Sequence, residues 1–572
     1  MRIKNLLIYF IPLIPSSLIF FYSSYEKSLY LSTFFYIGLI FLFKKYFKKE
    51  YIYKNVVNFS SLDYYILPLF IFIIFTQNRF LNIETITWDV SSYLVASNEI
   101  NYGYIPFETQ WESKGPLAIY IYFLLSKIVG VNYVYFKLLN DFILFLTIFI
   151  FVGIFKLYDS SKTRYIFFAF LLSSIFSIQW FVSEFTEFYC LPLIAYSNYL
   201  YIKNKNSNHK IIGFLFGLSF LINQGSILLY FPILLDSLFN NKNKKKLLKS
   251  YILQLVFFLI PNIFFIFVYL EKKLLDVLIS NYIYLPLGYI GERASSFYEL
   301  RVFLREIYNL NFFTYFAIIS IFLFYSLSLT FNSSLKIRNL FDLINLNILF
   351  AVAYYFVAGH NYYHHLIYLV SFSLFLILKI NQKFQMNLIF LLIFASSFVS
   401  FIESFKSSFN NLSDLNRVKQ EYPLYNLSNI IDSKFEKDNY TVLALDYVLV
   451  LYYLEKTNYS YIVHPTNHFQ DYITKTLIDL DRIQKNNIIE MLNQRPDVII
   501  CNTKAIDNGG RVMSTDPSSY GEDIVEGVYN FCDYKNFEKE YKQIDSSQYR
   551  SDPNLNFYYD PYKDMNIFIK NK

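Results

Sequence analysis

The residues best suited to chemistry lie between two apolar stretches, in the segment 79–115. Asp89 comes shortly after one apolar stretch, and Lys114 comes two residues before Pro116, where the next one begins. Because proline is favoured in the first turn of a helix, we expect Lys114 at the mouth of a helix near the bilayer surface. A carboxylate and an ammonium group there can face each other across a cleft. The alternative is that Asp89, Glu112 and Lys114 are solvated loop charges at a membrane interface.

Apolar blocks long enough to cross a hydrocarbon core of about 30 Å fill most of the first 403 residues. The chain is 55% hydrophobic and only 17% charged, whereas a soluble protein carries nearer a quarter charged residues. We expect about thirteen spans, an odd number that leaves the tail outside. They lie near 5–24, 28–44, 62–78, one net crossing within 116–157 (with 116–130 only partly embedded), 164–181, 187–202, 210–223, 225–240, 249–270, 311–331, 340–356, 366–380 and 386–403.

Basic clusters separate the apolar blocks and recur at alternate loops, as the positive-inside rule requires. A nucleic-acid binder would instead gather its charge on one soluble face, so the net charge of +7 does not indicate a nucleic-acid partner. We expect the N-terminus in the cytoplasm beside Arg2 and Lys4. The expected location is a bacterial-type plasma membrane, with the active site and the tail on its extracytoplasmic side.

The tail, residues 404–572, alternates short apolar runs with helical patterns, which favours a small α/β domain. Tyr440–Leu445 and Asp497–Cys501 are expected as buried strands, and Val448–Glu455 and Thr474–Gln494 as helices. Cys501 and Cys532 both lie in this domain, and whether they pair is left open. The fold class is therefore a polytopic α-helical membrane protein with a small extracytoplasmic α/β domain.

The first outer loop resembles that of the GT-C superfamily of membrane glycosyltransferases. The similarity is to the branch that contains protein O-mannosyltransferases and the aminoarabinose transferase of lipid A. The shared pattern is an acid after an early span, an aromatic residue soon after it, a Gly-x-x-Pro stretch and a Lys-x-Pro-Leu that opens the next helix. Here the pattern is carried by Asp89, Tyr93, Gly103–Pro106 and Lys114–Leu117.

The resemblance continues downstream and covers most of residues 60–403. Its further elements are Ser183–Glu187, Gly213–Gly217 and Gly359–Leu366. Many relatives carry a lysine where this chain has Asn223 or Gln224, which puts one donor-phosphate contact in doubt. The resemblance implies a division into two additional N-terminal spans (1–60), a GT-C-like catalytic module (61–403) and the outer domain (404–572).

The resemblance also implies roles for individual side chains. Sugar transfer from a lipid phosphate needs a carboxylate to take the acceptor's proton and cationic groups to hold the departing phosphate. Asp89 is the expected base. Glu184 and Glu187 are expected to orient the acceptor or, with Asp89, to hold a divalent cation such as Mg²⁺ or Mn²⁺; metal dependence stays open. The expected phosphate-binding residues are Lys114, His360, His364 and Arg293.

The function implied is an inverting transfer of sugar from a polyprenyl-phosphate donor to a glycan, lipid or protein acceptor of the cell envelope. Two alternatives remain: a transporter of lipid-linked glycan and a polysaccharide polymerase. Transporters bury ionisable groups at mid-membrane, between matching halves of the chain. Here the acids lie at the outer ends of spans and the halves do not match, which favours the enzyme.

Overall fold

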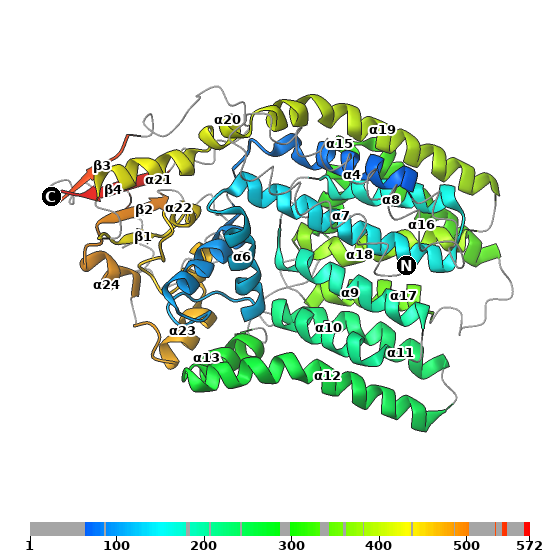
Figure 1. The fold of residues 1–572 in the computed structure, drawn as a ribbon, viewed down its shortest axis with the longest axis horizontal. Helices are drawn as coiled ribbons and strands as arrows, with labels where there is room; N and C mark the ends of the chain where they lie inside the picture. The colour runs from blue at the N-terminus through cyan, green and yellow to red at the C-terminus, as the bar shows by residue number, and fades with distance from the viewer. Residues whose placement is uncertain are drawn as a thin grey trace, which may run out of the picture.

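The computed structural model describes residues 63–84, 87–178, 184–204, 208–240, 243–285, 298–331, 342–357, 362–380, 383–435, 439–484, 487–502, 532, 540–545 and 565–571. Within these ranges, a bundle of apolar helices leads into a small domain of helices and short strands (Figure 1). Some predictions concern residues outside the described ranges, namely the two N-terminal spans, Arg293 and His360.

The long helices of the bundle run side by side (Figure 1). Three are long and apolar enough to cross a membrane, Tyr133–Tyr158, Lys244–Glu271 and Phe384–Ser413, and shorter apolar helices accompany them in the described part of the chain. The protein is therefore an integral membrane protein, while the count of about thirteen spans stays a prediction. The bundle contains α4 Asp63–Gln77, α7 Tyr133–Tyr158, α8 Lys162–Phe176, α9 Thr186–Lys203, α10 His209–Ile222, α11 Phe231–Asn240, α12 Lys244–Glu271, α16 Phe312–Phe331, α17 Leu343–Val357, α18 Ile367–Ser373, and α19 Lys383–Ser413.

Two glycines bring α10 and α12 into close contact. A Cβ atom added at Gly213 would lie 2.1 Å from the backbone oxygen of Gln254, and one at Gly217 would lie 2.5 Å from that of Phe258. Small residues four apart let membrane helices approach until their backbones touch. The glycine pair that the sequence shows in this helix therefore serves helix packing.

A layer of short helices separates the bundle from the C-terminal domain (Figure 1). It contains α5 Trp88–Ala96, the 3-10 helix η3 Ser97–Tyr102 and α6 Pro116–Val129. α6 has 14 residues, or about 21 Å of helix, and in Figure 1 it runs across the direction of the bundle helices. Its length and direction agree with the prediction that 116–130 is not a full crossing.

Further short elements connect the bundle helices. These are the 3-10 helices η2 Asn78–Phe80, η4 Gln224–Tyr230, η7 Tyr363–Leu366 and η8 Leu374–Lys379, the helix α13 Leu275–Ile279, the π-helix η5 Ser280–Tyr284 and the amphipathic helix α15 Tyr298–Leu310.

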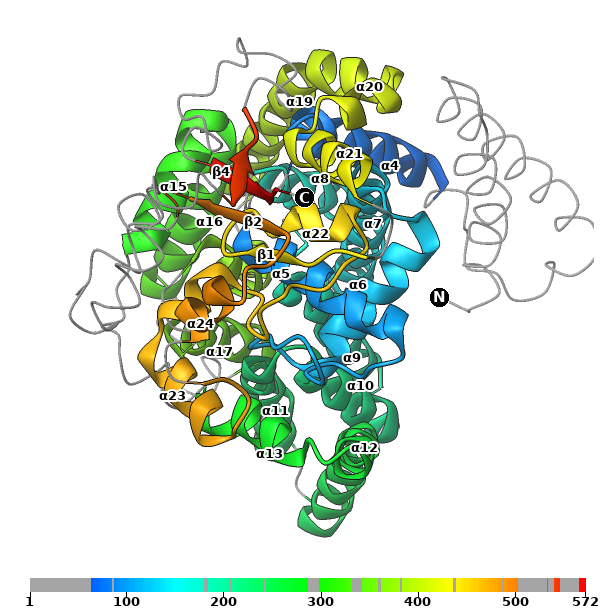
Figure 2. The same cartoon turned by 90° about the vertical axis from the view of Figure 1, so that its left-hand side faces the viewer.

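The C-terminal domain has a four-stranded mixed sheet in the order β1-β2-β4-β3. β1 Val442–Ala444 pairs with β2 Val498–Asn502 in parallel, while β4 Met565–Lys570 is antiparallel to β2 and to β3 Tyr541–Gln543. The predicted α/β character and the first two strands are thus confirmed. The domain faces the viewer in Figure 2. Its helices are α20 Leu415–Gln420, α21 Pro423–Lys434, α22 Leu449–Tyr453, the 3-10 helix η9 Pro465–Phe469, α23 Asp471–Asp479 and α24 Asn487–Asn493.

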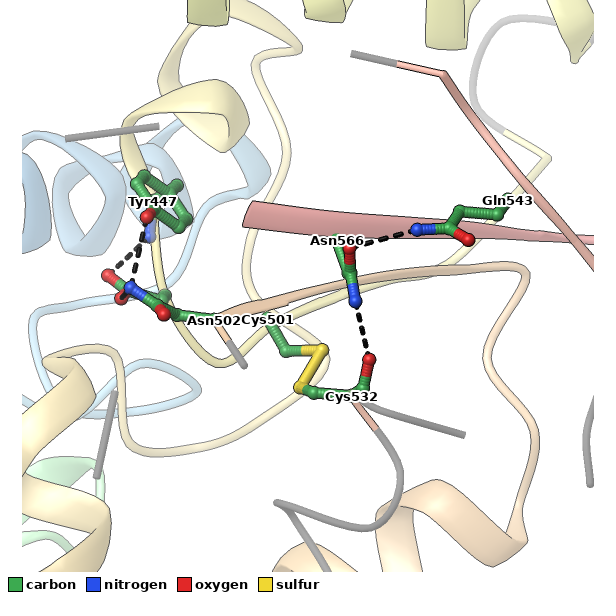
Figure 3. The surroundings of a disulfide bond; sticks show 7 residues. Tyr447, Cys501, Asn502, Cys532, Gln543 and Asn566 are labelled. Atoms are coloured by element: carbon green, nitrogen blue, oxygen red, sulfur yellow. Dashed lines mark hydrogen bonds between the residues drawn. A yellow bond between two sulfur atoms is a disulfide. The ribbon is translucent and has the colours of Figure 1, made fainter. Parts of the chain in front are cut away.

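One helix of this domain differs from the prediction, and one question that the sequence left open, the pairing of the two cysteines, is answered. The helix expected over Thr474–Gln494 is two helices, α23 and α24, because the chain turns after α23, where Asp481 has a left-handed φ of 54°. Cys501 of β2 and Cys532 form a disulfide, and Asn566 of β4 donates a hydrogen bond to the Cys532 carbonyl oxygen (Figure 3). The disulfide therefore lies directly beside the sheet.

Candidate active site

Asp89 lies in the first turn of α5, one of the short helices between the bundle and the C-terminal domain. One turn further along, the Tyr93 hydroxyl donates a hydrogen bond of 3.0 Å to Asp89 Oδ1. The Asp89 side chain keeps 33% of its surface exposed. A substrate can therefore reach this carboxylate, although the rest of α5 is mostly buried.

Lys114 lies just before α6, whose first residue is Pro116, as the sequence predicted. The neighbouring Gly115 donates its backbone N–H to the Ile222 carbonyl oxygen at 3.3 Å. A Cβ atom at Gly115 would lie 2.0 Å from the backbone oxygen of Leu221, so only glycine fits this contact with the end of α10. The start of α6, and with it Lys114, is thereby held against the bundle.

The Lys114 ammonium is available to a ligand. It is half-buried and lies in the electrostatic field of three carboxylates, Asp89, Glu112 and Glu187. No carboxylate oxygen of a described residue comes within 4.0 Å of it, which is the distance of an ion pair. An anion bound between these groups would therefore find an unpaired cation.

Glu187 lies in the first turn of α9 and is 1% exposed. Its Oε1 accepts hydrogen bonds of 2.8 Å from both the Tyr354 hydroxyl and the Asn223 amide, and its Oε2 lies 3.1 Å from the Thr186 hydroxyl. Asn223 stands where many relatives were expected to have a lysine. Its amide is engaged with Glu187, and neither Asn223 nor Gln224 supplies the cationic donor-phosphate contact that the resemblance implies.

Two histidines complete this part of the site. His365 Nε2 lies 3.8 Å from Glu187 Oε1, and the ring of His364 stacks on Phe185 with centroids 3.9 Å apart. Both histidines come from η7, at the start of the segment that contains α18. The predicted phosphate ligand His364 is thus brought to the same end of the bundle as Asp89 and Lys114.

Glu187, His364 and His365 can offer one ligand atom each, all within 4.8 Å of one another. One carboxylate and two imidazoles suit Zn²⁺ better than Mg²⁺ or Mn²⁺, which prefer oxygen ligands. Asp89 and Glu184, the partners expected from the sequence, are not part of this group, which is the one metal-capable group among the described residues. The donor set therefore fits a cation, but a different one from the kind expected.

Glu184 faces away from the cluster, although it lies only three residues before Glu187. It precedes α9 with a left-handed φ of 55°, and its carbonyl oxygen accepts the Tyr122 hydroxyl. Its carboxylate interacts with Lys137 and Tyr133 instead of Asp89. The expected role of Glu184 in acceptor binding or metal binding has no support in this arrangement.

The C-terminal domain contributes a residue that sequence reasoning missed. His464 Nε2 lies 3.8 Å from Asp89 Oδ1, and its ring meets the Trp88 ring edge to face. Thr466 Oγ lies 3.0 Å from His464 Nδ1, so its hydroxyl can donate there and leave the proton on the nitrogen that faces Asp89. Nothing in the local sequence indicates this contact, because the two residues lie far apart in the chain.

The domain is attached on both sides of the site. The Trp88 indole donates to Asp446 Oδ1 at 2.8 Å. Trp111 forms a parallel β-bridge with Ile462, and its indole donates to Asn281 Oδ1 at 2.9 Å. Hydrophobic residues of the domain share one core with the bundle, so the two parts form a continuous packed unit.

Glu112 is buried, which excludes for this residue the alternative of a solvated loop charge. It is 1% exposed; its Oε1 accepts from the Ser113 N–H and hydroxyl, and its Oε2 has no hydrogen-bond partner among the described residues. Burial raises the pKa of Glu112 to about 8, and the charge of Asp89 adds to this effect, against Lys114 and Ser113. Glu112 therefore holds its proton at neutral pH.

The pKa of Asp89 is shifted in the opposite direction from that of Glu112. Burial acts to raise its pKa, but His464, His364, Lys114 and the Tyr93 hydroxyl outweigh burial, so the pKa of Asp89 lies below that of a free aspartate. The site thus combines an ionised and a protonated carboxyl group at neutral pH. Such a division is what separate base and acid roles require.

No protein-family model matches the sequence, and no curated protein matches it. Among solved structures, ArnT from Cupriavidus metallidurans in the apo state matches with a TM-score of 0.52 at 10% sequence identity, over 77% of this chain and 92% of ArnT. The Archaeoglobus fulgidus oligosaccharyltransferase, tethered to an acceptor peptide containing the NVT sequon, matches with a TM-score of 0.40 at 13% identity, over 84% of this chain and 72% of that chain. The likeness to ArnT shows that this chain shares the fold of that protein, in agreement with the fold expected from the resemblance of its first outer loop.

Proposed function

We propose that the protein is a glycosyltransferase that moves a sugar from a polyprenyl-phosphate donor to a glycan, lipid or protein of the cell envelope, on the extracytoplasmic face of a bacterial-type plasma membrane. The observation that carries this proposal is that an ionised Asp89 and a Lys114 ammonium without an ion-pair partner among the described residues lie at the same end of a GT-C-like bundle. A lipid phosphate would rest at this level, with its chain in the bilayer and its sugar beside the carboxylate.

In the proposed reaction, Asp89 takes the proton of an acceptor hydroxyl. The acceptor oxygen then attacks the anomeric carbon, and the bond from that carbon to the phosphate oxygen breaks with inversion. Negative charge develops on the departing polyprenyl phosphate, where Lys114 and His364 stabilise it. Within this scheme His464 positions Asp89, because its Nε2 faces the carboxylate oxygen.

Glu187 and Glu112 have supporting roles in the proposal. Glu187 orients the imidazole of His365, and with His364 these groups would hold a divalent cation. When bound, such a cation would supply positive charge to the phosphate. Because Glu112 is protonated, Asp89 is the ionised member of the Asp89–Glu112 pair near Lys114.

The test is the substitution Asp89→Asn in a deletion strain, with mass spectrometry of the envelope glycans. The asparagine oxygen can still accept the Tyr93 hydrogen bond, so the variant should insert and accumulate normally. Loss of a general base typically costs about 10²–10⁴ in rate, so the transferred sugar should be nearly absent. The matched control is Asp159→Asn, which removes a carboxylate paired with Arg164 outside the cluster.

Normal glycan assembly by Asp89→Asn would refute the catalytic assignment and favour the transporter alternative. Loss of sugar in both variants at normal protein levels would also refute it, because the effect would then not be specific to the cluster.

A further inference from the structure

A second polar site lies where α4 and α19 end beside α20. An open cavity of about 730 Å³ is found there, and none of its lining residues belongs to the cluster around Asp89. Its lining residues are Arg79, Phe80, Asn82, Ile83, Ser407, Asn410, Asn411, Ser413, Asp414 and Arg417. Two guanidinium groups and one carboxylate thus line the cavity, and Glu403, which is not a lining residue, also interacts electrostatically with Arg79. That carboxylate, Asp414, is already engaged, since its Oδ1 accepts the Arg417 N–H at the start of α20.

The exposed side chains along α19 indicate that the cavity lies at the level of lipid headgroups. Exposed apolar side chains follow α19 at Phe384, Leu391, Phe394, Phe398 and Ile402. From Phe384 to Ile402 the helix rises about 27 Å, close to the 30 Å of a hydrocarbon core. The charged and exposed Glu403 and Lys406 come next; two further exposed apolar side chains, Phe405 and Phe409, lie on either side of Ser407, where the cavity begins. The apolar part of α19 would therefore lie against acyl chains, and the cavity would lie just beyond them.

The two arginines have hydrogen-bonding capacity to spare. Arg79 donates through Nη2 to the Ser177 carbonyl oxygen at 3.2 Å, whereas its Nε is buried and has no partner among the described residues. Arg417 is exposed and pairs with Glu421 at 2.7 Å. Because a guanidinium group has five N–H donors in a planar fork, both side chains retain donors that match the oxygens of a phosphate.

We propose that this cavity binds the phosphate group of an anionic membrane lipid, with the acyl chains along the apolar face of α19. Two cations at one headgroup-level cavity recognise the phosphate, and the adjoining apolar helix selects a lipid over a soluble anion. The site is separate from the proposed sugar transfer and does not depend on it.

Native mass spectrometry of the purified full-length protein tests the proposal, with phosphatidylglycerol and phosphatidylcholine as probes. The wild type should retain phosphatidylglycerol in preference to phosphatidylcholine. Arg79→Gln combined with Arg417→Gln should weaken this binding about tenfold or more, as expected for the loss of charge-assisted hydrogen bonds. Arg164→Gln combined with Arg495→Gln removes the same charge at ion pairs elsewhere and should leave binding unchanged.

Two single variants and a competition measurement complete the experiment. Arg417→Gln alone changes an exposed residue and should fold, so it should weaken binding even if the double variant is unstable; Arg79→Lys should retain part of the affinity. Unchanged binding in Arg417→Gln, or equal retention of the two lipids by the wild type, would overturn the proposal. Displacement of phosphatidylglycerol by millimolar inorganic phosphate would indicate a site for a soluble anion and would overturn it as well.

Discussion

The substitution Glu112→Gln should stabilise the protein at alkaline pH. Glutamine has the shape of the protonated acid, and its oxygen can accept the same two hydrogen bonds from Ser113. The side chain that it replaces is buried, and burial raises the pKa of Glu112 from 4.5 to about 8. The substitution removes the ionisation and leaves the packing intact.

The magnitude follows from the two pKa values. In the unfolded chain Glu112 loses its proton near pH 4.5, whereas the folded protein keeps it up to about pH 8. Between these values the folded state binds more protons than the unfolded state, so stability falls as the pH rises. At 1.36 kcal/mol for each pKa unit, the cost reaches about 5 kcal/mol above pH 8. The variant carries no such cost.

Thermal unfolding of the detergent-solubilised protein between pH 5 and pH 9 measures this difference. The gap in Tm between the variant and the wild type should widen from pH 5 to pH 8 and then level off. The control is Glu108→Gln, which removes a carboxylate that pairs with Lys272 at 3.2 Å and is more exposed than Glu112. Parallel curves for Glu112→Gln and the wild type would show that Glu112 ionises freely in the folded protein, which would refute the reasoning.

Three further predictions concern position, coupling and topology. Gly115→Ala inserts a methyl group against the backbone of α10 and should displace Lys114. The variants Gly115→Ala and Lys114→Ala should therefore each raise the donor concentration needed for half-maximal transfer by about tenfold or more. His464→Gln should lower transfer about tenfold or more and should move the acidic limb of the pH–rate profile to higher pH, since the electrostatic interaction with His464 lowers the pKa of Asp89; an unmoved limb would contradict the coupling. Alkaline phosphatase fused after Lys572 should be active, and an active cytoplasmic reporter there would contradict the outer location of the site.

The parts of the fold that follow from local pattern were predictable. Long apolar blocks predict the bundle helices, because a segment in lipid must form all its backbone hydrogen bonds internally, and a helix does so. Residues 249–270, for example, fall within α12, and 311–331 coincide with α16 to within one residue. The position of Lys114 at the mouth of α6 follows from Pro116 in the same way.

The direction of a side chain at a helix boundary could not be predicted from the sequence. Glu184 and Glu187 occupy one short motif, and the sequence treats them as equivalent. The backbone decides between them: Glu187 lies in the first turn of α9 and turns toward His365, whereas Glu184 precedes the helix in a left-handed conformation and turns toward Lys137. Burial of Glu112 depends on tertiary packing in the same way, so its charge state could not be inferred from its neighbours in the chain.

The location of His464 links the C-terminal domain to the chemistry of the bundle. The domain meets the layer of short helices at Trp88, directly beside Asp89, and at Trp111, three residues before Lys114. Asp89 and Lys114 therefore each lie within three residues of a tryptophan that holds the domain. Because α5 and the start of α6 are short, a change in domain position would be transmitted to Asp89 and Lys114 with little to absorb it. Docking of the domain and geometry of the site should accordingly change together.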